Sequence, residues 1–159
     1  MNPSYYKAIY QIITTGHMIT HQVGQELKEF GVTEPQFNVL RILKGARGKP
    51  VSVQEILGKM VQRNSNVTRI VDKLLAKGCV ERHQCPDNRR KMDITITDTG
   101  LALLEQLNKK VETLHQPIMN NLSNEELETL EQLINKLKSN INAQANPGLW
   151  RKQQQTIHQ

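Results

Sequence analysis

The feature that most constrains the fold is an amphipathic stretch at residues 63–78, RNSNVTRIVDKLLAKG. Its apolar residues fall at helical spacing and form one stripe: Val67, Ile70, Val71, Leu74 and Leu75. Four polar residues fall outside that stripe: Arg63, Asn66, Arg69 and Lys73. Asn64 or Ser65 can cap the start of the helix, and Gly78 suits the left-handed residue that ends one. We therefore expect a helix that packs with one face and presents the other to a partner.

The outward face of this helix carries arginine, asparagine and threonine, whose donors and acceptors match base edges and phosphates in a DNA major groove. This chemistry favours a recognition helix. A solvated amphipathic helix explains the stretch equally well when it is taken alone, because polar outer faces are common on surface helices. The neighbouring segments therefore decide between the two interpretations.

Two shorter helices are predicted before this stretch. Residues 33–44 begin with TEPQ, a capping box in which Thr33 caps the helix and Gln36 reaches back to it. GARGKP then breaks the helix, and Pro50 and Val51 allow a very short strand. The following SVQE is a second capping box, which begins a third helix. This helix, a short turn and the recognition helix together predict a helix-turn-helix unit.

A β-hairpin is predicted after Gly78, because the period of the sequence changes to two over residues 80–84 and again over residues 93–97. The predicted tip, residues 87–91, holds three consecutive cations, Arg89, Arg90 and Lys91. A basic hairpin tip directly after a helix-turn-helix indicates a wing that lies against the DNA backbone or in a narrow minor groove. A solvated basic loop is the alternative.

Positive charge is concentrated in this same region. The chain of 159 residues has a formal net charge of +6 and a pI near 9.4, which favours a polyanionic partner such as nucleic acid or an acidic membrane surface. Residues 59–91 contain nine Lys or Arg and three Asp or Glu, so this segment alone has an excess equal to the charge of the whole chain. The clustering favours nucleic acid.

Long helices are predicted on both sides of this region. Apolar residues recur at three and four over residues 5–30, and again after Thr97 as far as Pro117, which we expect to kink or interrupt the helix. Ser123 begins the capping box SNEE of a last helix, whose apolar residues step by three and four as in a coiled coil. Packing within one subunit is one interpretation of that seam, and we favour a homodimer. The predicted dimerisation residues are Ile9, Ile12, Ile13, Leu127, Leu130, Ile134, Leu137 and Ile141.

These elements predict a mainly α fold with a small β-hairpin wing, a winged helix-turn-helix flanked by N- and C-terminal dimerisation helices. Residues 33–97 are the expected DNA-binding region. Residues 1–32 and 98–146 are the expected helical dimerisation region, and residues 147–159 a polar C-terminal tail.

The segments NVTRIVDKLLAKGCVER and PDNRRKMDITITDTG resemble the MarR family of bacterial transcriptional regulators. Asp87, Arg89, Thr97 and Gly100 fall where that family has its DxR and LTxxG-like signature, and the resemblance extends over residues 5–145. It implies a triangular homodimer of winged helix-turn-helix subunits whose two recognition helices face double-stranded DNA. Cys79 departs from the family pattern, which usually has an aliphatic residue at this place.

The resemblance also implies particular DNA contacts. Ser65, Asn66, Thr68 and Arg69 would meet bases or phosphates, and Arg89 would be the wing-tip arginine, held by Asp87. Together with the outward helix face and the wing, the predicted DNA-binding residues are Ser52, Arg63, Asn64, Ser65, Asn66, Thr68, Arg69, Lys73, Asn88, Arg89, Arg90 and Lys91. The expected function is that of a regulator, a repressor, acting as a homodimer on a pseudo-palindromic operator.

Members of the family commonly bind small anionic or aromatic molecules in the crevice between the dimer helices and the DNA-binding lobe. The resemblance therefore implies a small-molecule effector that releases the DNA. His17, His21, Phe37 and Arg41 are the candidates for lining its pocket.

Other classes of function have weaker support in the sequence. There is no GxGxxG after a strand, no Walker loop, no HExxH and no GxSxG, so we expect neither catalytic residues nor a cofactor. We expect no metal site either, although His17 and His21, four apart on one helix, leave a metal-responsive regulator as an alternative. A winged-helix module that binds protein or RNA is another, and the predicted dimer seam counts against it because paired recognition helices match palindromic duplex DNA.

The two cysteines leave a redox-responsive regulator as a further alternative. Cys85 is the better candidate for a reactive thiol because neighbouring cations lower a thiol pKa, whereas Cys79 is expected to pack as a small hydrophobe. Their spacing favours reduced thiols over a disulfide framework. Without a run of 18 apolar residues or a signal peptide, the chain is expected to be cytoplasmic and to have no membrane partner.

Overall fold

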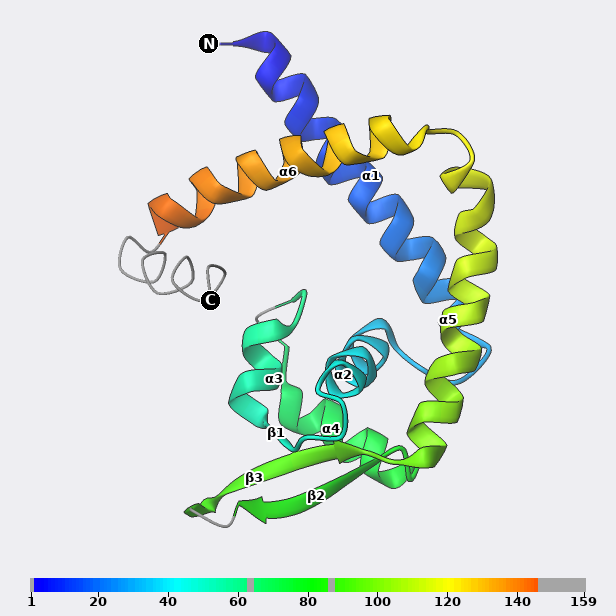
Figure 1. Ribbon diagram of the computed structural model, residues 1–159, viewed down its shortest axis with the longest axis vertical. Helices are drawn as coiled ribbons and strands as arrows, with labels where there is room; N and C mark the ends of the chain where they lie inside the picture. Colours follow the sequence, from blue (N-terminus) through cyan, green and yellow to red (C-terminus); the bar gives the residue numbers. More distant parts are fainter. Residues whose placement is uncertain (1, 63–64, 86–87, 146–159) are drawn as a thin grey trace. The chain divides into compact units, whose positions relative to one another are not determined.

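The computed structural model describes residues 2–62, 65–85 and 88–145, which form a mainly helical chain with one small antiparallel sheet (Figure 1). The elements in chain order are α1 (Pro3–Lys28), α2 (Glu34–Gly45), β1 (Val51–Ser52), α3 (Val53–Lys59), α4 (Val67–Ala76), β2 (Val80–Cys85), β3 (Asn88–Ile96), α5 (Asp98–Met119) and α6 (Asn124–Ala145). The predicted fold class is confirmed. The chain divides into two compact units, residues 1–114 and 115–159, and α5 runs from the first into the second.

The first two helices begin and end close to the predicted residues. Helix α1 ends shortly before Gly31, whose φ of 61° lies in the left-handed region that favours glycine. Helix α2 begins with the predicted capping box, in which the backbone amide of Thr33 donates to the Gln36 side chain at 2.9 Å. The glycine and the capping box in the sequence therefore predict where α1 ends and where α2 begins.

The second capping box is also present and begins α3. The Glu55 carboxylate accepts from the backbone amide of Ser52 at 2.9 Å, and the Glu55 amide donates to the Ser52 hydroxyl at 3.3 Å. Strand β1 ends at Ser52, so this residue joins the sheet to the helix-turn-helix.

Helix α4 begins later than predicted, and the prediction that Asn64 or Ser65 caps it is wrong. The cap is Asn66, whose Oδ1 accepts from the backbone amide of Arg69 at 3.1 Å. Ser65 is still in a turn, because its amide donates to the Gln62 carbonyl at 3.1 Å and its carbonyl accepts from the Val67 amide at 3.0 Å. The apolar stripe begins only at Val67, which is also the first residue of the helix. The stripe therefore predicted the start of α4 more accurately than the polar residues before it.

The wing is the hairpin of β2 and β3, and β1 pairs with the other edge of β3 to give the strand order β1-β3-β2. The predicted tip is partly wrong, because β3 begins at Asn88 and so already includes residues 88–91. Residues 87–91 are all polar in the sequence, so no alternation of apolar and polar residues indicated that the strand continues. Gln84 pairs with Met92 and Cys85 with Asn88, so residues 89–91 lie in an irregularity between two adjacent pairs.

The core lies in the first unit, where α1 to α5 and the sheet meet. It contains Leu27 from α1, Phe37, Val39, Leu40 and Leu43 from α2, Ile56 from α3, Val67, Val71 and Leu74 from α4, Val80 and Ile94 from the sheet, and Leu104 and Leu107 from α5. Leucine, isoleucine and valine supply most of the packing, as a chain with 4% aromatic residues requires. Within the described residues, no helix has the length and apolar content to cross a membrane.

A compact junction joins α4, the wing and α5. Gly78, with φ of 66°, ends α4, and its carbonyl accepts from the Thr97 hydroxyl at 2.7 Å. The Thr97 oxygen in turn accepts from the Gly100 amide at 3.0 Å and so caps α5. A Cβ on Gly100 would lie 2.0 Å from the carbonyl oxygen of Cys79, so this position requires glycine. The contacts at this junction therefore explain why the signature has threonine at Thr97 and glycine at Gly100.

Helix α5 continues into the second unit, which also contains α6. Pro117 lies inside α5, and the helix ends at Met119. Helix α6 begins with the predicted capping box, because the Ser123 amide donates to the Glu126 carboxylate at 2.8 Å and the Glu126 amide to the Ser123 hydroxyl at 3.2 Å.

Candidate DNA-binding interface

The outward face of α4 is the centre of the candidate interface. Three buried side chains hold the opposite face in the core: Val67, Val71 and Leu74. Thr68, Arg69 and Lys73 are exposed, as the helical period predicts. Packing of the buried face thus fixes the orientation of the helix backbone that carries these side chains, which supports base readout.

Asn66 also caps α4, and this role restricts the base contacts that its side chain can make. Its Oδ1 is bonded to the Arg69 amide as the helix cap. A bidentate contact with adenine uses both the oxygen and the amide group of an asparagine, so Oδ1 of Asn66 would have to accept a second hydrogen bond while its side chain keeps the cap geometry. Only the backbone amide of Arg69 takes part in this cap and its guanidinium does not, so Arg69 is the stronger candidate for base readout.

A hollow of about 290 Å³ lies between the start of α2 and α4. The α2 side is lined by Thr33, Pro35 and Gln36, and the other side by Ser65, Asn66, Arg69, Ile70 and Lys73. Arg69 and Lys73 lie four residues apart and so share one side of the helix. The hollow therefore combines two cations with the N-terminal end of a helix, an arrangement that favours small anions.

Ser52 is the predicted contact that lies where β1 ends and α3 begins. It is half-buried, and its hydroxyl donates to the Glu55 carboxylate at 2.7 Å. The capping box therefore uses this hydroxyl, and a DNA contact by Ser52 stays a prediction.

The remaining predicted contacts belong to the turn before α4 and to the wing. Arg63, Asn64 and Asp87 lie outside the described residues. Asn88, Arg89, Arg90 and Lys91 form the start of β3, and the structure describes their backbone as part of the wing. The wing and α4 are thus the two elements that carry the predicted cations.

An ion pair that sequence analysis missed joins these two elements. Arg82, on β2, donates through Nη2 to Oδ1 of Asp72, on α4, at 2.7 Å. The Arg82 side chain is 29% exposed and that of Asp72 55%, and the buried Nε of Arg82 has no hydrogen-bond partner among the described residues. A pair this exposed contributes little to the free energy of unfolding. The two residues lie ten positions apart on a helix and a strand, and helical or strand periodicity relates only residues of one element. No sequence signal could therefore place the two side chains together.

The comparisons with known proteins agree with this geometry. The model of the MarR family matches residues 32–92, which contain the helix-turn-helix and most of the wing. The multiple antibiotic resistance protein MarR of Escherichia coli strain K12 is 33% identical over 137 residues, which cover 80% of this chain and 92% of that protein. The chain belongs to the MarR family.

Two further relatives support this assignment. The transcriptional repressor MprA of Escherichia coli strain K12 is 30% identical over 124 residues, covering 77% of this MarR-family chain and 70% of that protein. A crystal structure of a mutant Escherichia coli MarR complexed with operator DNA has a TM-score of 0.70 at 29% identity, covering 80% of this chain and 91% of that one. The family resemblance seen in α4 and the wing is confirmed.

The four predicted effector residues are not among those that line the hollow between α2 and α4. His17 and His21 are exposed on α1, where the Nε2 atom of His21 lies 3.2 Å from the side-chain nitrogen of Gln25. Phe37 is buried in the core, and the guanidinium of Arg41 lies 5.6 Å from the centre of its ring. An effector pocket at these four residues stays a prediction.

Cys79 packs in the core, as predicted for a small hydrophobe. Its side chain is 2% exposed. Burial raises the pKa of the Cys79 thiol, and the nearby charge of Lys77 opposes that shift only in part. The side chain of Cys85 lies outside the described part of the structure. Among the described residues, no three His, Cys, Asp or Glu side chains gather so that they could hold a metal ion.

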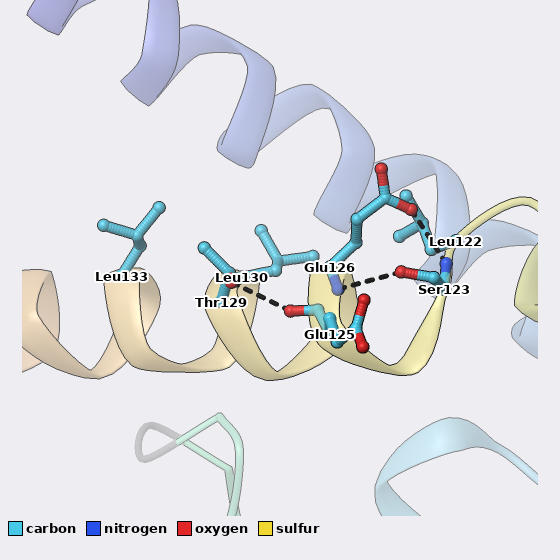
Figure 2. A pocket seen from close by; sticks show the side chains of 7 residues that line it. All are labelled: Leu122, Ser123, Glu125, Glu126, Thr129, Leu130 and Leu133. Carbon is cyan, nitrogen blue, oxygen red and sulfur yellow. Dashed lines mark hydrogen bonds between the residues drawn. The ribbon is translucent and has the colours of Figure 1, made fainter.

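Exposed apolar side chains remain on α1 and α6. On α1 these include Tyr5, Tyr6, Tyr10, Ile12 and Ile13, and on α6 Leu127, Leu130, Leu133 and Ile141. The other predicted dimerisation residues, Ile9, Ile134 and Leu137, are half-buried. A hollow of about 680 Å³ lies at the start of α6. Figure 2 shows the side chains that line it, among them Leu122, Leu130 and Leu133. Both surfaces are more apolar than solvent-facing helices usually are.

Proposed function

We propose that this MarR-family regulator is a cytoplasmic homodimeric repressor that binds a pseudo-palindromic DNA duplex through α4 and the wing. The observation that carries the proposal is the exposed face of Thr68, Arg69 and Lys73, whose helix is fixed by its buried stripe. The ion pair of Asp72 and Arg82 joins this helix to the basic wing. The complex of the Escherichia coli relative with operator DNA is further support.

The dimer part of the proposal rests on the exposed apolar side chains of α1 and α6. Charged or polar residues would cover these helices if both faced solvent in the functional protein. A second copy is the partner we propose, with residues 1–32 and 98–146 forming the dimer and residues 33–97 binding DNA. Two-fold symmetry would then present two α4 helices to the two half-sites of a palindrome.

The effector part of the proposal rests on the hollow between α2 and α4. A small anion held there by Arg69 and Lys73 would occupy two of the cations proposed to contact DNA. Binding of the anion and of DNA would then be mutually exclusive, which is the simplest route to release. The effector site that the family resemblance implies near His17, His21, Phe37 and Arg41 is the second candidate for the same role.

The experiment that tests the function compares Arg69→Ala with Arg89→Ala on a duplex selected from a random pool by the wild-type chain. Arg89→Ala should weaken binding to every duplex and reduce the slope of log affinity against log salt by roughly one unit for each phosphate that the variant no longer neutralises. Arg69→Ala should cost about 1–3 kcal/mol at one base position of the site and little at the others.

Two results would contradict this division. Identical profiles for the two variants would mean that Arg69 holds a phosphate and reads no base. Failure of the wild-type chain to select any duplex, together with tight binding to structured RNA, would favour the RNA-binding alternative.

A further inference from the structure

The turn between α3 and α4 is bonded to α2 through the side chain of Asn38, which is not among the predicted DNA-binding residues. Oδ1 of Asn38, in α2, accepts from the backbone amide of Val61 at 3.0 Å. The two residues lie 23 positions apart in the chain, so this bond links separate elements. Val61 is the first residue after Met60, which ends α3 with an extended backbone.

The turn has little else to fix its start. Met60 is buried, but the Val61 side chain is 78% exposed and that of Gln62 is also exposed, so apolar anchoring stops at Met60. In the described part of the turn, the other backbone hydrogen bonds are local, from Ser65 to Gln62 and from Val67 to Ser65. The Asn38 side chain thus fixes the path of the chain after α3, because it accepts from the Val61 amide just beyond Met60, the last buried residue.

We propose that Asn38 is a positioning residue for base readout, because it fixes the path of the turn that leads into α4. The inference rests on the proposed binding of DNA through α4. Contacts with base edges depend on tenths of an ångström and on direction, whereas phosphate contacts tolerate displacement. Removal of the bond between Asn38 and Val61 should therefore lower affinity for the cognate site more than affinity for unrelated DNA.

The test measures the ratio of affinities for the selected duplex and for a scrambled duplex of the same length. Asn38→Ala removes the acceptor, and Asn38→Asp keeps an oxygen in the same place. Asn135→Ala is the matched control, since it makes the same change at an exposed position inside helix α6. Both alanine variants share the gain in helix propensity, so the comparison isolates the effect of the hydrogen bond. Hydrogen exchange of the Val61 amide, followed by NMR, reports the bond without DNA.

Asn38→Ala should lower the affinity ratio about fivefold, the effect of one ordinary hydrogen bond, and should accelerate exchange at Val61. Asn38→Asp and Asn135→Ala should leave both quantities near their wild-type values, because the ratio cancels the uniform effect of the added charge. An unchanged ratio for Asn38→Ala, or a lower ratio without faster exchange at Val61, would overturn the inference while the proposed function stands. A wild-type chain that binds neither duplex would overturn both.

Discussion

At the scale of single residues, the junction between α4, the wing and α5 leaves no room beneath the backbone of Cys79. Gly100 occupies this place, where a methyl group would lie 2.0 Å from the carbonyl oxygen of Cys79 and 2.9 Å from the side chain of Ile96. The backbone oxygen cannot rotate away as a flexible side chain would. The junction must therefore shift if any side chain is introduced.

Gly100→Ala is expected to lower the free energy of unfolding by about 3 kcal/mol, the upper part of the range for overpacking. Gly58→Ala is the matched control, because Gly58 lies in α3 with nothing within 4 Å of its added Cβ. That control should be neutral or stabilise by up to about 1 kcal/mol. Denaturant titration of both variants is the measurement, and equal stabilities would contradict the packing described for Gly100.

The thiol of Cys79 should react slowly in the folded protein. Burial raises its pKa, so the thiolate fraction at neutral pH falls below that of an unfolded chain, and access is also restricted. In a Cys85→Ser variant, which leaves Cys79 as the only thiol, alkylation by iodoacetamide should be slower than in denaturant by at least about tenfold. Equal rates in the two conditions would show that Cys79 is accessible and reactive.

At the scale of elements, the ion pair of Asp72 and Arg82 joins the wing to α4, the two parts of the proposed recognition surface. The pair should contribute less than about 1 kcal/mol to the free energy of unfolding, because both side chains are partly exposed. Its effect on DNA binding should be larger, since it sets the position of one contact surface relative to the other.

A double-mutant cycle measures this coupling. Arg89→Ala should lower the salt slope of binding by roughly one unit in the wild-type background and by less in an Asp72→Asn background, where the wing is no longer held. Additive effects of Asp72→Asn and Arg89→Ala on affinity and slope would contradict a positioning role for the pair. Thermal unfolding of Asp72→Asn is the control for global damage.

How far sequence predicts these elements depends on the range of the interaction. Local chemistry was sufficient for the capping boxes at Thr33, Ser52 and Ser123, because partners three residues apart meet whenever a helix begins. The buried stripe of α4 followed from its period. The start of α4 was predicted too early, because several polar residues in a row offer equivalent caps and the turn bonds decide among them.

The parts of the interface that sequence could not predict depend on tertiary contacts. The bond from Val61 to Asn38 and the pair of Asp72 and Arg82 join elements whose approach is set by the core, and no period connects such residues. Residues 87–91 are all polar and therefore show no apolar alternation by which a strand could be distinguished from a loop. Sequence therefore predicted the elements of the interface and their outward faces, but not the contacts that hold them in place.

At the scale of the whole molecule, the exposed apolar side chains of α6 require a cover, and a second copy of the chain is the proposed one. Leu130→Glu combined with Leu137→Glu would bury charge in the proposed seam, so monomers or insoluble chain are expected. Gln132→Glu, an exposed residue of the same helix outside the predicted seam, is the control and should remain dimeric. Light scattering gives the mass in each case, and a wild-type monomer at micromolar concentration would contradict the dimer.

In the proposed complex, a two-fold dimer presents two α4 helices and two wings to one face of a DNA duplex. Hydroxyl-radical footprinting on the selected duplex tests this arrangement most directly. We expect two protected half-sites related by dyad symmetry, with centres about 10 base pairs apart, and additional protection outside each half-site from the wings. Protection of a single isolated half-site, or of no segment at all, would contradict it.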